Sequence, residues 1–143
     1  MRPKRSGPDP VSHVGTLLEA YYRRAFVRHG PGLKGADWPK EGDALLRYGL
    51  HQRAMEGRRA ASVLDVGCGA GYFFEFLKKN RNPQERALRY LGVDCVPEMI
   101  AAARKKYPDA EFRVSALQDG LPGVAARDFS VAAAVKWVGD TGA

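Results

Sequence analysis

The chain has 143 residues, 45% of them apolar, which suits a single domain with a packed core. It contains no run of about 18 apolar residues and only two cysteines, so we expect neither a transmembrane helix nor a disulfide framework. The net charge of +7 is uneven, because residues 1–60 carry 12 Lys and Arg against 6 Asp and Glu. This basic section fits either a solvated helical surface or binding to a nucleic acid or an acidic substrate.

Residues 1–11 are basic and rich in proline, and no apolar segment follows them. This predicts a disordered tail rather than a signal peptide. With Cys68 and Cys95 expected as reduced thiols, the protein is predicted to be cytoplasmic and not to contact a membrane.

Residues 12–60 predict two helices. The first has Ser12 as a candidate N-cap and ends at Gly30. Its predicted apolar face has helical spacing and comprises Val14, Leu17, Leu18, Tyr21 and Ala25. The second is expected from about residue 40 to residue 55, with an apolar set of Leu45, Leu46, Tyr48, Leu50 and Met55. Trp38 lies between the two helices, where a place in the core and a role in a cap fit equally well.

Strands and helices alternate from residue 61 onward. We expect strands over residues 61–66, 89–94, 110–115 and 129–138, and helices over residues 72–80 and 97–107. The inward faces of these helices are predicted at Phe73, Phe76 and Leu77, and at Met99, Ile100, Ala103 and Tyr107. The alternation indicates βαβ units, and therefore an α/β fold with a parallel sheet.

Three glycines, Gly67, Gly69 and Gly71, follow the first predicted strand. Glycine permits a positive φ and removes the Cβ that would keep a ligand away from the backbone. The dinucleotide fingerprint G-x-G-x-x-G requires a third glycine where this chain has Tyr72, which disfavours a nicotinamide-dependent dehydrogenase. A P-loop is excluded, because no Gly-Lys-Ser/Thr follows the glycines.

Two acids accompany the glycines. Asp65 ends the first predicted strand, and Asp94 ends the second. A carboxylate at the end of the second strand can accept hydrogen bonds from both vicinal hydroxyls of a ribose. Each acid alone also fits a purely structural role, Asp65 in the turn and Asp94 as the cap of the following helix.

The stretches VLDVGCGAGYF and YLGVDCVPEMIAAARKKYPDAEFRVSAL resemble the class I S-adenosylmethionine-dependent methyltransferases over about residues 61–135. The resemblance implies a Rossmann-like parallel sheet in the order 3-2-1-4, with S-adenosylmethionine as cofactor. The glycine loop then lies against the methionine part, Asp94 binds the ribose, and residues 96–99 flank the adenine. The cofactor-binding residues predicted on this basis are Asp65, Gly67, Cys68, Gly69, Ala70, Gly71, Asp94, Cys95, Met99, Ala116 and Leu117.

Two departures from that family affect the predictions. Ala116 stands where relatives often have an acid that binds the adenine amino group, so we expect backbone groups of Ala116 and Leu117 there. The family fold has seven strands and this chain reaches the fourth, so we expect a chain truncated after that strand. Its apolar edge is then able to pair with a second copy. The predicted organisation is a tail over residues 1–11, a helical cap or lid over residues 12–60, and a partial cofactor-binding domain over residues 61–143.

Methyl transfer from a sulfonium is a displacement in which the cofactor carries the reactive group, so the sequence identifies no catalytic base. The cysteines and histidines show no metal-ligand spacing. The leading hypothesis is a methyltransferase with an unidentified acceptor. The alternatives are a truncated, non-catalytic cofactor-binding or interaction module, and a nucleic-acid-binding protein that uses the basic section.

Overall fold

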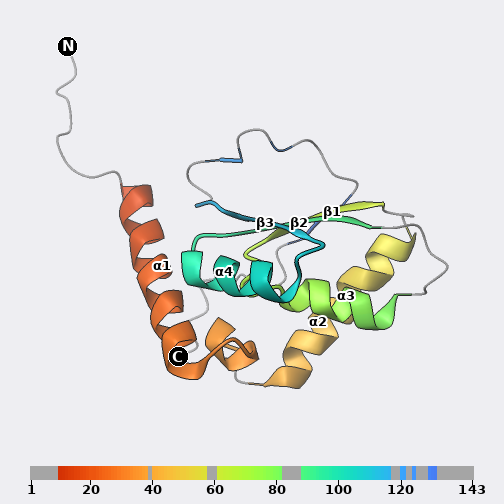
Figure 1. Cartoon of the computed structure of the whole chain (residues 1–143), viewed down its shortest axis with the longest axis horizontal. Helices are drawn as coiled ribbons and strands as arrows, with labels where there is room; N and C mark the ends of the chain where they lie inside the picture. The colour runs from red at the N-terminus through yellow and green to blue at the C-terminus, as the bar shows by residue number, and fades with distance from the viewer. Residues whose placement is uncertain are drawn as a thin grey trace, which may run out of the picture.

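The computed structural model describes residues 10–38, 40–57, 61–81, 88–116, 120–121, 124 and 129–131, with residues 10–14 and 129–131 described by their backbone alone. A four-stranded sheet lies at its centre (Figure 1). Its strands are β1 (Ser62–Val66), β2 (Arg89–Asp94), β3 (Glu111–Val114) and β4 (Phe129–Val131). All pairs are parallel and the order is β3-β2-β1-β4, which confirms the predicted Rossmann-like sheet and its strand order.

The helices are α1 (Pro10–His29), the short 3-10 helix η1 (Leu33–Ala36), α2 (Glu41–Gly57), α3 (Tyr72–Asn80) and α4 (Pro97–Lys106). Figure 1 shows α3 and α4 side by side along one face of the sheet. Helix α1 packs on α4, and α2 packs on α3. The two N-terminal helices therefore reach the sheet through the helices of the βαβ units. Within the described ranges, none of the helices combines the length and apolar character needed to cross a bilayer.

An aromatic cluster fills the space between the sheet and α3. The ring of Phe74 lies 4.8 Å from that of Tyr90 and 5.2 Å from that of Tyr107, measured between centroids. Phe112 packs edge-on against the same ring. Phe73 and Leu77 are buried as predicted, and Phe74 is a further core residue that the prediction omitted. On α4, the predicted inward face of Met99, Ile100, Ala103 and Tyr107 is buried throughout.

The predictions for α1 were partly wrong. The helix begins at Pro10, so Ser12 lies inside it rather than capping it, and the predicted tail over residues 1–11 overlaps it by two residues. Leu17 and Tyr21, both assigned to the apolar face, are 56% and 49% exposed. Tyr22 and Phe26 pack against the core instead. Apolar residues form adjacent rows on this helix, and contact with α4 and η1 covers only some of them.

The apolar set predicted for α2 also needs correction. Leu45, Leu46 and Leu50 are exposed, whereas Tyr48 and Met55 are buried as expected. Ala44 completes the buried face. Helix α3 packs on one side of α2. The apolar residues on the other sides of α2 therefore stay exposed.

Candidate functional site

The loop between β1 and α3 adopts backbone conformations that glycine favours. Gly67, Gly69 and Gly71 have φ values of 74°, 56° and 88°. Gly71 ends the loop as the N-cap of α3, and a Cβ built there would lie 3.0 Å from the ring of Tyr107. The absence of a side chain at Gly71 therefore serves the packing of the core as well as the turn.

Tyr72 occupies the position where the dinucleotide fingerprint has glycine. A Cβ on Gly69 would lie only 2.8 Å from its ring, so the ring packs directly against the glycine loop. Its hydroxyl donates a hydrogen bond of 3.0 Å to the carbonyl oxygen of Gly32. Tyr72 therefore joins the loop to the segment that leads into η1.

Asp94 ties the end of β2 to the glycine loop. Its Oδ2 accepts a hydrogen bond of 2.9 Å from the N–H of Gly69, and its Oδ1 accepts one of 2.9 Å from the N–H of Val96. Burial raises the pKa of this carboxyl, and the backbone hydrogen bonds act in the opposite direction by favouring the ionised form. One side chain thus fixes the loop after β1 and the entry to α4.

Asp65 lies in a different environment, 1% exposed within β1. The hydroxyl of Tyr90 donates a hydrogen bond of 2.5 Å to its Oδ2. Burial is the main cause that raises the pKa of Asp65, to about 7, and the Tyr90 hydrogen bond partly offsets it. Asp65 therefore joins β1 to Tyr90 of β2 inside the core.

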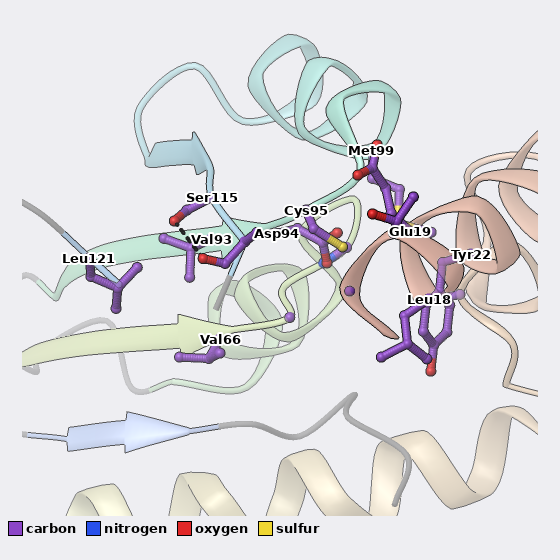
Figure 2. A pocket seen from close by; sticks show the side chains of 16 residues that line it. Leu18, Glu19, Tyr22, Val66, Val93, Asp94, Cys95, Met99, Ser115 and Leu121 are labelled. Carbon is purple, nitrogen blue, oxygen red and sulfur yellow. Dashed lines mark hydrogen bonds between the residues drawn. The ribbon is translucent and has the colours of Figure 1, made fainter. Parts of the chain in front are cut away.

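A pocket of about 190 Å³ opens at the carboxyl ends of the strands (Figure 2). A single water needs roughly 10–15 Å³ of such space, so a small organic molecule can enter. Helix α1 borders the pocket on one side, with Met99 of α4 beside it. The lining residues are Gly15, Thr16, Leu18, Glu19, Tyr22, Ala36, Val66, Gly67, Gly69, Val93, Asp94, Cys95, Met99, Ser115, Ala116 and Leu121.

Six of the predicted cofactor-binding residues meet in this pocket: Gly67, Gly69, Asp94, Cys95, Met99 and Ala116. Four others do not line it: Asp65, Cys68, Ala70 and Gly71. Leu117 lies outside the described residues. The prediction named none of the α1 residues, because no local motif shows that a helix about 50 residues upstream of the loop folds over it. The expected lid over residues 12–60 was the one sequence signal that pointed to this section.

Most of the pocket lining is apolar, and its charged side chains are all acidic. Glu19 and Asp94 are its carboxylates, and the described lining residues include no Lys, Arg or His. Burial raises the pKa of the Cys95 thiol to about 11, and the charges of Asp94 and Glu19 add to the effect. In the part of the chain that the structure describes, no group of three His, Cys, Asp or Glu side chains could hold a metal ion.

Trp38, for which the sequence left two roles open, belongs to the core. It is buried, and its ring lies edge-on to Tyr48 at 6.5 Å between centroids. The guanidinium carbon of Arg47 lies 5.2 Å from the Trp38 ring centroid, a cation–π arrangement. The described residues that line the pocket do not include Trp38.

Strand order, glycine loop and the acid at the end of β2 together define a Rossmann-like fold. Residues 63–140, more than half of the chain, match the methyltransferase domain family, and the chain belongs to that family. The predicted family and fold are thereby confirmed.

Individual relatives match parts of the chain. Trans-aconitate 2-methyltransferase of Variovorax paradoxus is 39% identical over 82 residues, covering 57% of this chain and 30% of that protein. Demethylmenaquinone methyltransferase of Chlorobaculum tepidum is 38% identical over 61 residues, covering 43% of this chain and 23% of that protein. The matched part thus spans less than a third of the length of these curated relatives.

Among solved structures, the plantazolicin methyltransferase BpumL in complex with SAH superposes with a TM-score of 0.54 at 18% identity. The match covers 85% of this chain and 49% of that one. It shows a shared fold.

Proposed function

We propose that this chain binds S-adenosylmethionine in the pocket under α1, and that the protein transfers the methyl group to an acceptor still to be identified. The observation that carries the proposal is the position of Asp94, which lines the pocket and holds Gly69 of the glycine loop. Its oxygens accept the N–H groups of Gly69 and Val96, the backbone of Cys95 also hydrogen-bonds to this carboxylate, and a carboxylate has about four acceptor sites in all. Asp94 can therefore receive a ribose hydroxyl without releasing the loop.

The same geometry argues against a dinucleotide. Dinucleotide sites bind the pyrophosphate on N–H groups of the glycine loop at the start of the helix. Here the N–H of Gly69 already donates to the carboxylate of Asp94, so it is not available to a phosphate. The described lining residues offer no basic side chain to balance phosphate charge. A cofactor without phosphates fits this pocket better.

The cofactor would supply the electrophilic methyl group, and the chain would supply its position and a dry environment. Gly67 and Gly69 are the residues proposed for the methionine part, Asp94 for the ribose, and Cys95 and Met99 for the adenine. Ala116 and Leu117 are proposed to meet the adenine through their backbone. For Asp65, Cys68, Ala70 and Gly71 we propose a supporting role, because they shape the loop rather than line the pocket.

We also propose that residues 12–60 form a lid, because α1 borders the pocket from Gly15 to Tyr22.

We further propose that two copies of the chain pair through β4, which lies at the edge of the described sheet. Sedimentation of the chain over a range of concentrations tests it. A monomer at every concentration would rule it out.

Calorimetric titration tests the cofactor proposal. We expect S-adenosylmethionine and S-adenosylhomocysteine to bind with one site per chain, and NAD to give no heat. The Asp94→Ala variant should bind both ligands at least about tenfold more weakly, because it loses a charge-assisted hydrogen bond to the ligand. The matched control is Asp109→Ala, which removes an exposed carboxylate paired with Lys78 at 3.5 Å. Absence of heat with both adenosyl ligands would overturn the proposal.

A second candidate function is a cofactor-binding module without turnover. Two curated methyltransferases are matched over only 30% and 23% of their length, so their activity is not carried over to this chain. Incubation with S-adenosylmethionine labelled in its methyl group separates the two functions. Transfer of label to any acceptor supports the enzyme, whereas binding without transfer across a panel of small-molecule acceptors supports the module.

A further inference from the structure

Helix α1 brings a second carboxylate to the pocket. Glu19 lines it together with Asp94, on the side of Cys95 and Met99 (Figure 2). Its charge reaches the neighbouring groups, since it contributes to the raised pKa of the Cys95 thiol. Glu19 belongs to no motif of the glycine loop or of the strand ends, and it comes to the site only because α1 packs on α4.

Glu19 is held in place by Arg23, one turn further along α1. The Arg23 Nη2 lies 2.7 Å from Oε1 of Glu19, and its Nε lies 3.0 Å from both carboxylate oxygens of Glu98 on α4. One guanidinium therefore faces two carboxylates, and this cluster of Glu19, Arg23 and Glu98 keeps a net charge of −1. With Asp94 the pocket and its border carry two net negative charges, and no cation of the described lining offsets them.

We propose that Glu19 is a specificity-determining residue of the pocket, which favours a positively charged ligand over a neutral one of the same shape. The inference rests on the proposed function, in which the cofactor is a sulfonium cation and its demethylated product is a neutral thioether. Glu19 lies beside Cys95 and Met99, on the proposed adenine side, so it would act on the sulfonium through the pocket and not by contact. A carboxylate in an apolar, half-enclosed pocket attracts a cation more strongly than it does in water, and over a longer distance. The pocket would thus retain the loaded cofactor and release the product.

Calorimetry of S-adenosylmethionine and S-adenosylhomocysteine on the intact chain tests the role of Glu19. The readout is the ratio of the two dissociation constants, which an inactive or unfolded fraction does not change. Glu19→Gln should shift this ratio by about fivefold in favour of S-adenosylhomocysteine, because only the sulfonium loses an attractive charge. Glu19→Asp keeps the charge and should restore the ratio to within about twofold of the wild type.

Glu98→Gln is the matched control. It removes the same charge from the same cluster, but from a carboxylate that does not line the pocket. We expect it to change the ratio by less than about twofold. An unchanged ratio in Glu19→Gln, or equal shifts in both glutamine variants, would overturn the inference while leaving cofactor binding intact. If the wild type binds neither ligand, the proposed function fails and this inference fails with it.

Discussion

The carboxylate of Asp94 and the backbone N–H of Gly69 are joined by a hydrogen bond of 2.9 Å, although 25 residues separate them in the chain. This bond links the end of β2 to the loop that follows β1, and both residues line the pocket. The loop conformation and the predicted ribose site therefore depend on the same side chain. A substitution at Asp94 is expected to affect stability and ligand binding together.

Asp94→Ala tests this coupling. Removal of the carboxylate leaves the N–H groups of Gly69 and Val96 without their acceptor, so we expect the free energy of unfolding to fall by about 1.5–3 kcal/mol. Urea denaturation measures the loss. Asp109→Ala, the exposed control, should change stability by less than about 0.5 kcal/mol. Equal stability of the two variants would mean that the carboxylate does not hold the loop.

The buried carboxyl of Asp65 predicts a pH dependence of stability. Its pKa is raised from an ordinary value of 3.8 to about 7, mainly by burial, so the folded state binds a proton that the unfolded state releases at lower pH. The contribution is fully present below about pH 4 and is lost as the pH rises toward about 7, with a slope of at most about 1.4 kcal/mol per pH unit.

Urea denaturation of the wild type and Asp65→Asn between these pH values isolates the effect. The stability difference between the two proteins should decline as the pH rises and level off above about pH 7. Tyr90→Phe, which removes the hydrogen bond that lowers the pKa, should extend the decline to higher pH. A difference that is constant with pH would contradict a raised pKa at Asp65.

Gly71→Ala tests the backbone requirement of the loop. The added Cβ would meet the Tyr107 ring at 3.0 Å in a backbone conformation with φ of 88°, so we expect a loss of about 1–3 kcal/mol. Gly42→Ala is the matched control, because this exposed position of α2 has open space around it. That change should be neutral or stabilise the protein by up to about 1 kcal/mol, since alanine favours helix. Thermal unfolding compares the two.

Trp38→Ala tests the assignment of Trp38 to the core. The loss of a buried ring packed against Tyr48 should cost about 3–5 kcal/mol of folding free energy. Because Trp38 does not line the pocket, we expect the ligand affinity of the folded molecules to change by less than about threefold. A change of that size would come from small displacements of the neighbouring η1. A large affinity loss without a loss of stability would instead place Trp38 at the ligand.

The βαβ section could be predicted closely because its signals are local. The strand at residues 89–94 and the helix at residues 72–80 match the predicted bounds, since glycine, proline and apolar periodicity mark their ends. Asp94 was assigned to the site for the same reason, as an acid at the end of a strand. The exposed positions Leu17 and Leu46 show the limit of this reasoning. Helical spacing identifies apolar rows, but only tertiary contacts decide which row is covered.

The lining of the candidate pocket was therefore predictable along the strand ends and not along α1. Glu19 reaches the pocket through the packing of α1 on α4, which no spacing in the chain encodes. Gly71 illustrates the reverse case. Its pattern predicted a ligand contact, and the structure shows a packing role that the pattern did not indicate, because its missing side chain makes room for Tyr107.

An adenosyl cofactor is proposed to bind between α1 and the ends of β1 and β2. Titration of the ¹⁵N-labelled chain with S-adenosylhomocysteine, followed by amide chemical shifts, tests it most directly. We expect shifts at Gly67, Gly69 and Cys95 and at residues 15–22 of α1, with Lys79 at the far end of α3 unchanged. Shifts confined to α2 or to the carboxyl ends of α3 and α4 would contradict it.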